Sequence, residues 1–195
     1  MTWYRRGIWR MIPAIVLGLM VLAPAAMAQY GVPLFDMGDE AEGNFHLFSS
    51  AFESNTVMPR RYTCDSRNAS PPLEWSGASV RAESFAIIMD DPDAPVGTWV
   101  HWVVYNIPGT VTELPEGVAK QETLPDGTRQ GLNSFGEIGY SGPCPPRGPE
   151  HRYVFRLYAL DAMLDLPASA TKEDLLVALE HHVLGRTKLV GRYER

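Results

Sequence analysis

From residue 45 to the end of the chain, short apolar runs are separated by Pro, Gly, Asn and Asp, and this punctuation constrains the fold most strongly. Runs such as residues 85–89 and 103–107 have the length of single β-strands. Residues 99–107 are apolar on both alternating faces, which predicts a strand covered on both sides. Residues 153–160 and 189–193 alternate with a period of two. The pattern therefore predicts a β-rich single domain with a few helices.

One helix is predicted near the C-terminus. Residues 171–174 read as a capping box, and the leucines that follow recur with Val183 at helical spacing. Gly185 is expected to end this helix as its C-cap. His181 and His182 would then lie near its last turn, where we expect solvated surface side chains rather than a functional pair.

The first 28 residues have the pattern of a secretory signal peptide. Arg5, Arg6 and Arg10 form a basic start, an apolar run follows, and small residues end at Ala28. A retained membrane anchor is the alternative, because residues 11–28 carry no charge. Twin-arginine export is a further open route. We expect cleavage after Ala28, a flexible acidic leader over residues 29–43, and one domain over residues 44–195.

Charge and cysteine content limit the compartment and the partners. The whole chain has a formal charge of −6, and cleavage leaves −9, because residues 1–28 carry three arginines and no acidic residue. Such a chain repels nucleic acid, so no nucleic-acid partner is expected. Export to a periplasmic or extracellular space favours a disulfide between Cys64 and Cys144, the only two cysteines. Two buried free thiols are the alternative.

Two segments join a proline-stiffened loop to an apolar strand that begins with a histidine. The first is Asp91-Pro92-Asp93-Ala94-Pro95 followed by Trp99 and His101, and the second is Gly142-Pro143-Cys144-Pro145-Pro146 followed by His151 and Tyr153. If the two strands are neighbours, two carboxylates, two imidazoles and a phenol meet in one pocket, which would suit a small charged ligand.

The first segment gives three specific expectations. Asp91 and Asp93, two positions apart in an extended stretch, are expected to point the same way. Strand periodicity places His101 on one face with residues 99, 103 and 105. A loop carboxylate beside His101 is expected to fix its tautomer and raise its pKa.

The second segment is a rigid rim rather than a phosphate-binding loop, because its prolines lack N–H groups. The amides of Gly142 and Cys144 are among the few donors that it keeps. His151 and Tyr153, two residues apart on one strand face, are the expected ligand-binding side chains.

Both segments resemble the signature regions of the phosphatidylethanolamine-binding proteins, in particular their bacterial branch described as Raf-kinase-inhibitor-like. Three further segments are similar to that branch: Tyr62-Thr63-Cys64, Asn68-Ala69-Ser70-Pro71-Pro72-Leu73-Glu74-Trp75 and Asn133-Ser134-Phe135-Gly136. The resemblance runs from about residue 45 to residue 193. It implies a mainly β, antiparallel, sandwich-like fold with peripheral helices.

The resemblance also implies a pocket for anions. Its residues here would be Asp91, Asp93, His101, Gly142, Pro143, His151 and Tyr153. Family members bind phosphate-type groups, and some eukaryotic members restrain kinases or proteases. Cys144 and an extra proline depart from the animal form and suit a disulfide to Cys64. The long C-terminal helical segment of animal members is not expected here, and neither is kinase restraint by their route.

Three functions compete. The leading hypothesis is an exported binding protein for a small anion or a phospholipid headgroup, with inhibition or modulation of a partner protein as an added role. It needs no cofactor, metal or catalytic residue. The alternative is a hydrolase that uses the Asp/His group, with or without a metal. The third is an interaction protein with a vestigial pocket. Because two carboxylates repel a phosphate, either both histidines are protonated or the ligand is an amine.

Overall fold

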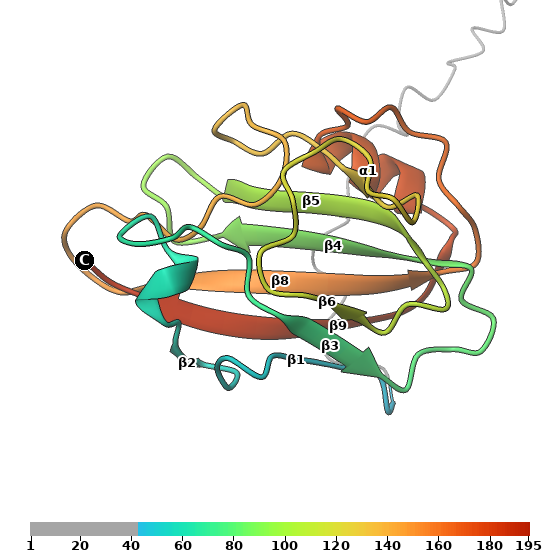
Figure 1. Cartoon of the computed structure of the whole chain (residues 1–195), viewed down its shortest axis with the longest axis horizontal. Helices are drawn as coiled ribbons and strands as arrows, with labels where there is room; N and C mark the ends of the chain where they lie inside the picture. Colours follow the sequence, from blue (N-terminus) through green and yellow to red (C-terminus); the bar gives the residue numbers. More distant parts are fainter. Residues whose placement is uncertain (1–42) are drawn as a thin grey trace, which may run out of the picture. The chain divides into compact units, whose positions relative to one another are not determined.

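The computed structural model describes residues 43–195 (Figure 1), so the predicted signal peptide and nearly all of the acidic leader lie outside the described residues. The strands are β1 (His46–Phe48), β2 (Thr56–Val57), β3 (Leu73–Ser76), β4 (Ser84–Asp91), β5 (Trp99–Pro108), β6 (Glu113–Leu114), β7 (Arg129–Gln130), β8 (His151–Leu160) and β9 (Val183–Tyr193). The helices are a 3-10 turn, η1 (Arg60–Tyr62), and α1 (Lys172–Leu179). Within residues 43–195, no helix is long and apolar enough to cross a membrane.

The strands form two sheets. The larger has the order β2-β9-β8-β4-β5-β7, and the smaller has the order β1-β3-β6. In the described part of the chain, β2 and β9 pair in parallel, whereas the other named pairs are antiparallel. The predicted mainly β fold is therefore confirmed.

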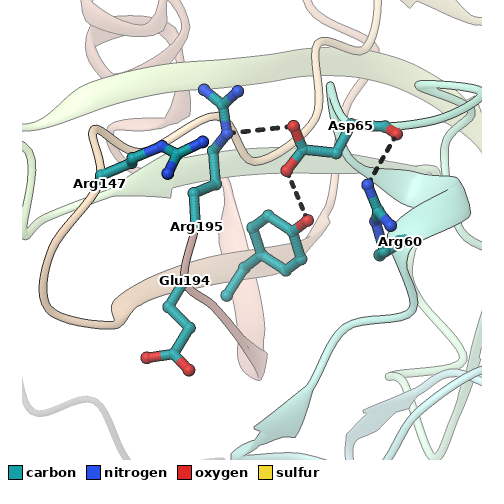
Figure 2. Close-up of a pocket in the computed structure, with 6 residues that line it drawn as sticks. Arg60, Asp65, Arg147, Glu194 and Arg195 are labelled. Atoms are coloured by element: carbon teal, nitrogen blue, oxygen red, sulfur yellow. Dashed lines mark hydrogen bonds and ion pairs between the residues drawn. The ribbon is translucent and has the colours of Figure 1, made fainter.

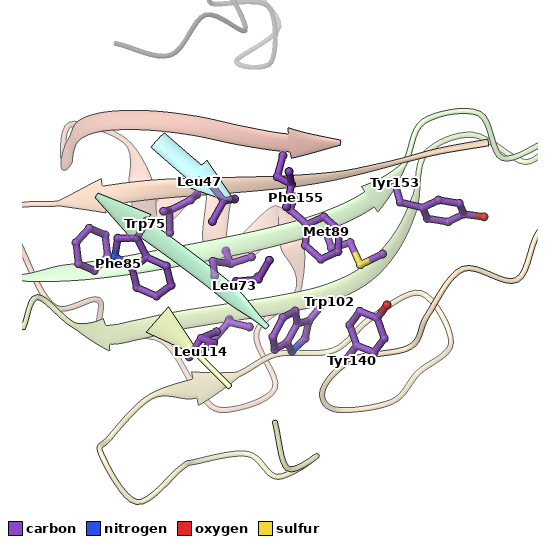
Figure 3. Close-up of a cluster of buried hydrophobic side chains, with 14 of the residues drawn as sticks. Leu47, Leu73, Trp75, Phe85, Met89, Trp102, Leu114, Tyr140, Tyr153 and Phe155 are labelled. Atoms are coloured by element: carbon purple, nitrogen blue, oxygen red, sulfur yellow. The ribbon is translucent and has the colours of Figure 1, made fainter. Parts of the chain in front are cut away.

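Side chains between the two sheets form the main core (Figure 3). Leu73 and Trp75 of the small sheet pack with Phe85, Trp102 and Phe155 of the large one. Fully burying one such side chain contributes about 1.5–3 kcal/mol. This cluster covers one face of the large sheet, in which the paired register of β4, β5 and β8 aligns the ends of the long strands.

A second core covers the opposite face of the large sheet. Ile88, Val103 and Tyr105 pack there with Leu175 and Leu179 of α1. All eight residues of β4 are buried, and so are residues 100–107 of β5. The prediction that residues 99–107 form a strand covered on both sides is thus confirmed.

The predicted capping box is present, but the predicted helix end is wrong. Thr171 accepts a hydrogen bond from the backbone N–H of Asp174, and the Asp174 side chain accepts one from the N–H of Thr171. The helix ends at Leu179, and Gly185 lies inside β9. Residues 183–193 pair with the full length of β8, so long-range strand pairing overrides the helical spacing of Val183.

Cys64 and Cys144 form the predicted disulfide, with their Cα atoms 5.4 Å apart. The bond joins the turn after η1 to the loop before β8, across 80 positions of sequence. The backbone N–H of Cys64 also donates to the carbonyl of Pro143 at 3.1 Å. The proline-rich loop is therefore fixed by a covalent bond and by hydrogen bonds.

Candidate functional site

The two segments singled out in the sequence meet at one end of the large sheet. In antiparallel pairing, the end of β4 lies beside the starts of β5 and β8, with Asp91 opposite Trp99 and Asp90 opposite Val154. The loop after β4 and the loop before β8 extend from this same end. Strand order therefore brings together residues that are 60 positions apart.

A cavity of about 220 Å³ lies at this end of the sheet. Its lining residues are Asp91, Ala94, Pro95, Val96, Trp99, His101, Phe135, Cys144, Pro145, Pro146, His151 and Tyr153. Four of the seven predicted ligand-binding residues line it, namely Asp91, His101, His151 and Tyr153. An apolar wall with a few convergent polar groups is the usual composition of a small-molecule site.

Asp91 and His151 form a buried pair inside this cavity. Nδ1 of His151 lies 2.7 Å from Oδ2 of Asp91, and the two side chains are only 5% and 4% exposed. The other carboxylate oxygen, Oδ1, accepts a hydrogen bond from the backbone N–H of Asp93 at 2.8 Å. Both oxygens of Asp91 are thus engaged, and Nε2 is the ring nitrogen of His151 that remains for a ligand.

The carboxylate of Asp93 lies apart from that of Asp91 and has a different partner. The turn that begins at Asp91 sends the Asp93 carboxylate to Arg152, whose guanidinium donates to both of its oxygens at 2.7 and 2.9 Å. These bonds lower the pKa of Asp93 to about 2. The expectation that the two carboxylates point the same way is wrong, because a tight turn replaces the extended backbone that it assumed.

A β-bulge positions His101. Met89 pairs with Trp102 and Asp90 pairs with Val100, so His101 is the extra residue of β5 in the ladder. Its ring meets that of Tyr153 edge-on at 5.2 Å, on the face of the sheet opposite to Val103 and Tyr105. The predicted shared face with residues 103 and 105 is therefore wrong. Bulges next to functional sites often redirect a side chain in this way.

The expected protonation of His101 is also corrected. Its Nδ1 lies 2.6 Å from the carbonyl oxygen of Ser141, and a carbonyl only accepts, so Nδ1 carries the proton. Burial lowers the pKa of His101 below its ordinary value, despite the nearby charges of Asp91 and Asp90. The neutral ring therefore offers Nε2 as an acceptor, because desolvation outweighs the attraction of carboxylates that bond elsewhere.

The hydroxyl of Tyr153 is buried and, within the described part of the chain, has no hydrogen-bond partner. Burial is the main cause that raises the pKa of Tyr153, and the charge of Asp91 and the closeness of its carboxylate to the hydroxyl add to it. The phenol therefore stays neutral, and its O–H forms no hydrogen bond of normal geometry within the described residues. An unsatisfied buried polar group of this kind calls for a functional explanation.

Gly142 and Pro143 are not among the lining residues and hold the loop in place instead. The N–H of Gly142 donates to Oδ1 of Asn68 at 2.7 Å. A Cβ at position 142 would lie 2.1 Å from the carbonyl oxygen of Tyr62, so only glycine fits there.

Several contributors were absent from the predicted site. Trp99 and Phe135 form an edge-on aromatic pair at 5.4 Å in the wall of the cavity, and Ser141 orients His101. Both aromatics stand inside the segments that carried the family resemblance, which was the available signal. Arg152 follows His151 directly, and its role became visible only through its contact with Asp93.

The polar groups in this cavity offer a ligand both a donor and acceptors. The O–H of Tyr153 can donate and Nε2 of His101 can accept. Because Nδ1–H of His151 is bonded to Asp91, its Nε2 accepts in the neutral ring and donates in the protonated ring. Among residues 43–195, no group of three or more His, Cys, Asp or Glu side chains is arranged to hold a metal ion. The fold and the cavity define a two-sheet β protein with a small polar pocket at the end of its large sheet.

Comparisons with known proteins identify the family. The protein-family model described as phosphatidylethanolamine-binding protein matches residues 48–194, so the chain belongs to this family. A UPF0098 protein from Methanothermobacter thermautotrophicus is 55% identical over 150 residues, which cover 77% of this chain and 99% of that protein. The predicted family membership is thus confirmed, and the relatives place the chain in a branch found in bacteria and archaea.

Comparison with solved structures supports the same family assignment. A phosphatidylethanolamine-binding protein homologue from Chlamydia trachomatis has a TM-score of 0.72 and 40% identity, with 78% of this chain and 99% of that chain covered. YbcL of E. coli, described as a member of the mammalian family, has a TM-score of 0.73 and 32% identity at the same coverage.

Proposed function

We propose that this protein is an exported binding protein whose cavity takes a small anion or a phospholipid headgroup. The observation that carries the proposal is the buried hydroxyl of Tyr153, which has no partner among the described residues and lines the cavity with the Asp91–His151 pair. A buried hydroxyl left without a partner costs about 1–3 kcal/mol. An oxygen of a bound anion would accept its hydrogen bond and recover that cost.

The bonding of the two carboxylates supports an anion over an amine. Asp91 bonds to His151, and Asp93 bonds to Arg152, so each negative charge is already next to a cationic or polar donor. A phosphate group would then meet the O–H of Tyr153 and, when the His151 ring is protonated, its Nε2–H. The acceptor Nε2 of His101 would suit a protonated oxygen or an ammonium group of the same ligand, as in phosphorylethanolamine.

Calorimetric titration with phosphate and with phosphorylethanolamine across pH 5 to 8 tests this proposal. His151→Ala is expected to weaken binding by about 1.5–3 kcal/mol, the worth of a charge-assisted hydrogen bond. His181→Ala, at an exposed position after α1, is the matched control and is expected to bind as the wild type does. Equal affinity of wild type and His151→Ala, or no binding of either compound, would refute the proposal.

Hydrolysis is the second candidate, and the Asp91–His151 pair favours it, because a carboxylate that orients an imidazole at 2.7 Å is also the arrangement of a general base. The reaction would be attack of water on an ester of the bound anion. Release of phosphate from phosphorylethanolamine, with and without added divalent metal ions, is the assay. Turnover that is lost in His151→Ala would favour the enzyme.

Export is proposed from the basic, apolar and small-residue pattern of residues 1–28, and the Cys64–Cys144 disulfide supports an oxidising compartment. N-terminal sequencing of the protein expressed in a bacterial host is expected to begin at Gln29. A membrane-bound product that retains Met1 would contradict both the cleavage and the periplasmic or secreted location.

Inhibition or modulation of a partner protein stays a prediction, as does the vestigial-pocket alternative. Native mass spectrometry of the mature protein distinguishes them. A small molecule retained in the cavity supports ligand binding, whereas an empty cavity together with a stable protein complex supports an interaction protein.

A further inference from the structure

A second cavity, of about 390 Å³, lies near the C-terminal end of β9. Its lining residues are Arg60, Asp65, Arg147, Tyr193, Glu194 and Arg195 (Figure 2). Three guanidinium groups therefore share one cavity with two carboxylates, although the chain as a whole has a formal charge of −6. Such a gathering of guanidinium groups in an acidic protein is a candidate anion site.

Both carboxylate oxygens of Asp65 form contacts within the cavity wall. Its Oδ2 accepts a hydrogen bond from the hydroxyl of Tyr193 at 2.7 Å, and its Oδ1 pairs with Nε of Arg195 at 3.0 Å. Its backbone oxygen accepts from the guanidinium of Arg60 at 3.4 Å. These contacts lower the pKa of Asp65, with the Tyr193 bond as the main cause. Asp65 thus positions Arg60 and Arg195, and each of its carboxylate oxygens is engaged by a residue other than Arg147.

Arg147 is the unsatisfied member of the group. It is exposed, and no residue in the range 43–195 forms an ion pair or hydrogen bond with its guanidinium. The other carboxylate, that of Glu194, points away from the guanidinium groups in Figure 2. Arg147 and Arg195 therefore line the same cavity as like charges, with N–H donors that a shared anion could bridge. Guanidinium forks match the oxygens of a phosphate group bidentately.

We infer that this cavity is a second anion site, which takes a phosphate group between Arg147 and Arg195, with Arg60 as a further cation. The site is independent of the proposed function of the first cavity. The two are adjacent in sequence, because Cys144, Pro145 and Pro146 line the first cavity and Arg147 lines the second. A guanidinium of Arg195 also donates to the sulfur of Cys144 at 3.6 Å, which ties this wall to the disulfide.

Titration with inorganic phosphate, followed by the side-chain N–H signals of arginine in NMR, tests the site directly. The Nε–H signals of Arg147 and Arg195 are expected to shift with one common dissociation constant. Arg147→Gln is expected to weaken this binding by about tenfold or more. Because Arg147 has no ion pair or hydrogen bond to lose among residues 43–195, the variant is expected to fold. Arg81→Gln, an exposed arginine between β3 and β4, is the matched control and is expected to change nothing.

A second arm separates free phosphate from a lipid headgroup. Vesicles of phosphatidylcholine with and without phosphatidic acid are mixed with the wild type, Arg147→Gln and Tyr153→Phe. Binding of phosphate or of acidic vesicles that falls in Arg147→Gln and persists in Tyr153→Phe supports this second site, even where the first cavity binds nothing. Absence of arginine shifts and of vesicle binding, or binding that Arg147→Gln leaves unchanged, overturns the inference.

Discussion

The carboxylate of Asp91 and the imidazole of His151 lie 2.7 Å apart although 60 residues separate them in the chain. The end of β4 and the start of β8 are neighbours in the large sheet, and this brings the two side chains together. Because of this contact, the Asp91 carboxylate orients the His151 ring and is not left free to repel a phosphate. It is the relationship on which the first cavity's chemistry depends.

Removal of the Tyr153 hydroxyl is expected to stabilise the protein and weaken ligand binding. Tyr153→Phe deletes a buried O–H that has no partner among the described residues, so the free energy of unfolding is expected to rise by about 1 kcal/mol. The affinity of the first cavity for phosphate is expected to fall by about 1 kcal/mol for the same lost donor, with the second cavity unaffected. Chemical denaturation and calorimetry measure the two effects. Loss of stability with unchanged affinity would contradict this role.

His101 is expected to make the protein less stable in acid. Burial lowers its pKa below the ordinary value of 6.5, so the unfolded chain binds the proton more tightly than the folded one. The free energy of unfolding therefore has its full value above pH 6.5, where His101 is neutral in both states. It decreases as the pH falls from 6.5 toward the folded-state pKa, by up to about 1.4 kcal/mol per pH unit.

Denaturant unfolding at pH 7.5, 6.5 and 5.5 measures this dependence. His101→Gln keeps a donor for the carbonyl of Ser141 but does not titrate, so its stability is expected to vary less over this range. His181→Gln removes an exposed imidazole and is the control. Parallel curves for the wild type and His101→Gln would show that His101 does not carry the effect.

The two aspartates are expected to differ in function. Asp93→Asn breaks a half-exposed pair with Arg152 and should cost about 0.5–1 kcal/mol of stability at pH 7, without a change in phosphate affinity. Asp91→Asn removes the partner that orients His151 and should weaken phosphate binding about tenfold. The contribution of Asp93 is present above its ordinary pKa of 3.8 and is lost as the pH falls through about 2. Equal affinities of the two variants would contradict the distinction.

The Cys64–Cys144 disulfide is expected to contribute roughly 4–5 kcal/mol, because it closes a loop of about 80 residues in the unfolded chain. In the double variant Cys64→Ala/Cys144→Ala, the free energy of unfolding should be lower by that amount. The midpoint of denaturant unfolding should fall accordingly. Reductant should destabilise the wild type and leave the double variant unchanged. Alkylation of both thiols in the unreduced protein would disprove the bond.

The sequence predicted those features that depend on local patterns or on the conspicuous pairing of two segments. Period-two alternation indicated the strands, the residues at 171–174 indicated the start of α1, and an even number of cysteines indicated the disulfide. The side chains of His151 and Tyr153 were placed correctly on one face, since β8 is regular there. The end of α1 was misplaced because pairing of β9 with β8, a long-range interaction, decides it.

Only the tertiary structure decided what each polar group contacts. A bulge in β5 turns His101 toward Tyr153, and a tight turn after β4 gives Asp91 to His151 and Asp93 to Arg152. Burial then sets the protonation of His101 against the expectation from nearby charge. Sequence by itself determined the mainly β fold class and four residues that line the cavity, Asp91, His101, His151 and Tyr153, because strand periodicity and segment motifs are local. The bonding within the site required the structure, because contact geometry and desolvation depend on residues far apart in the chain.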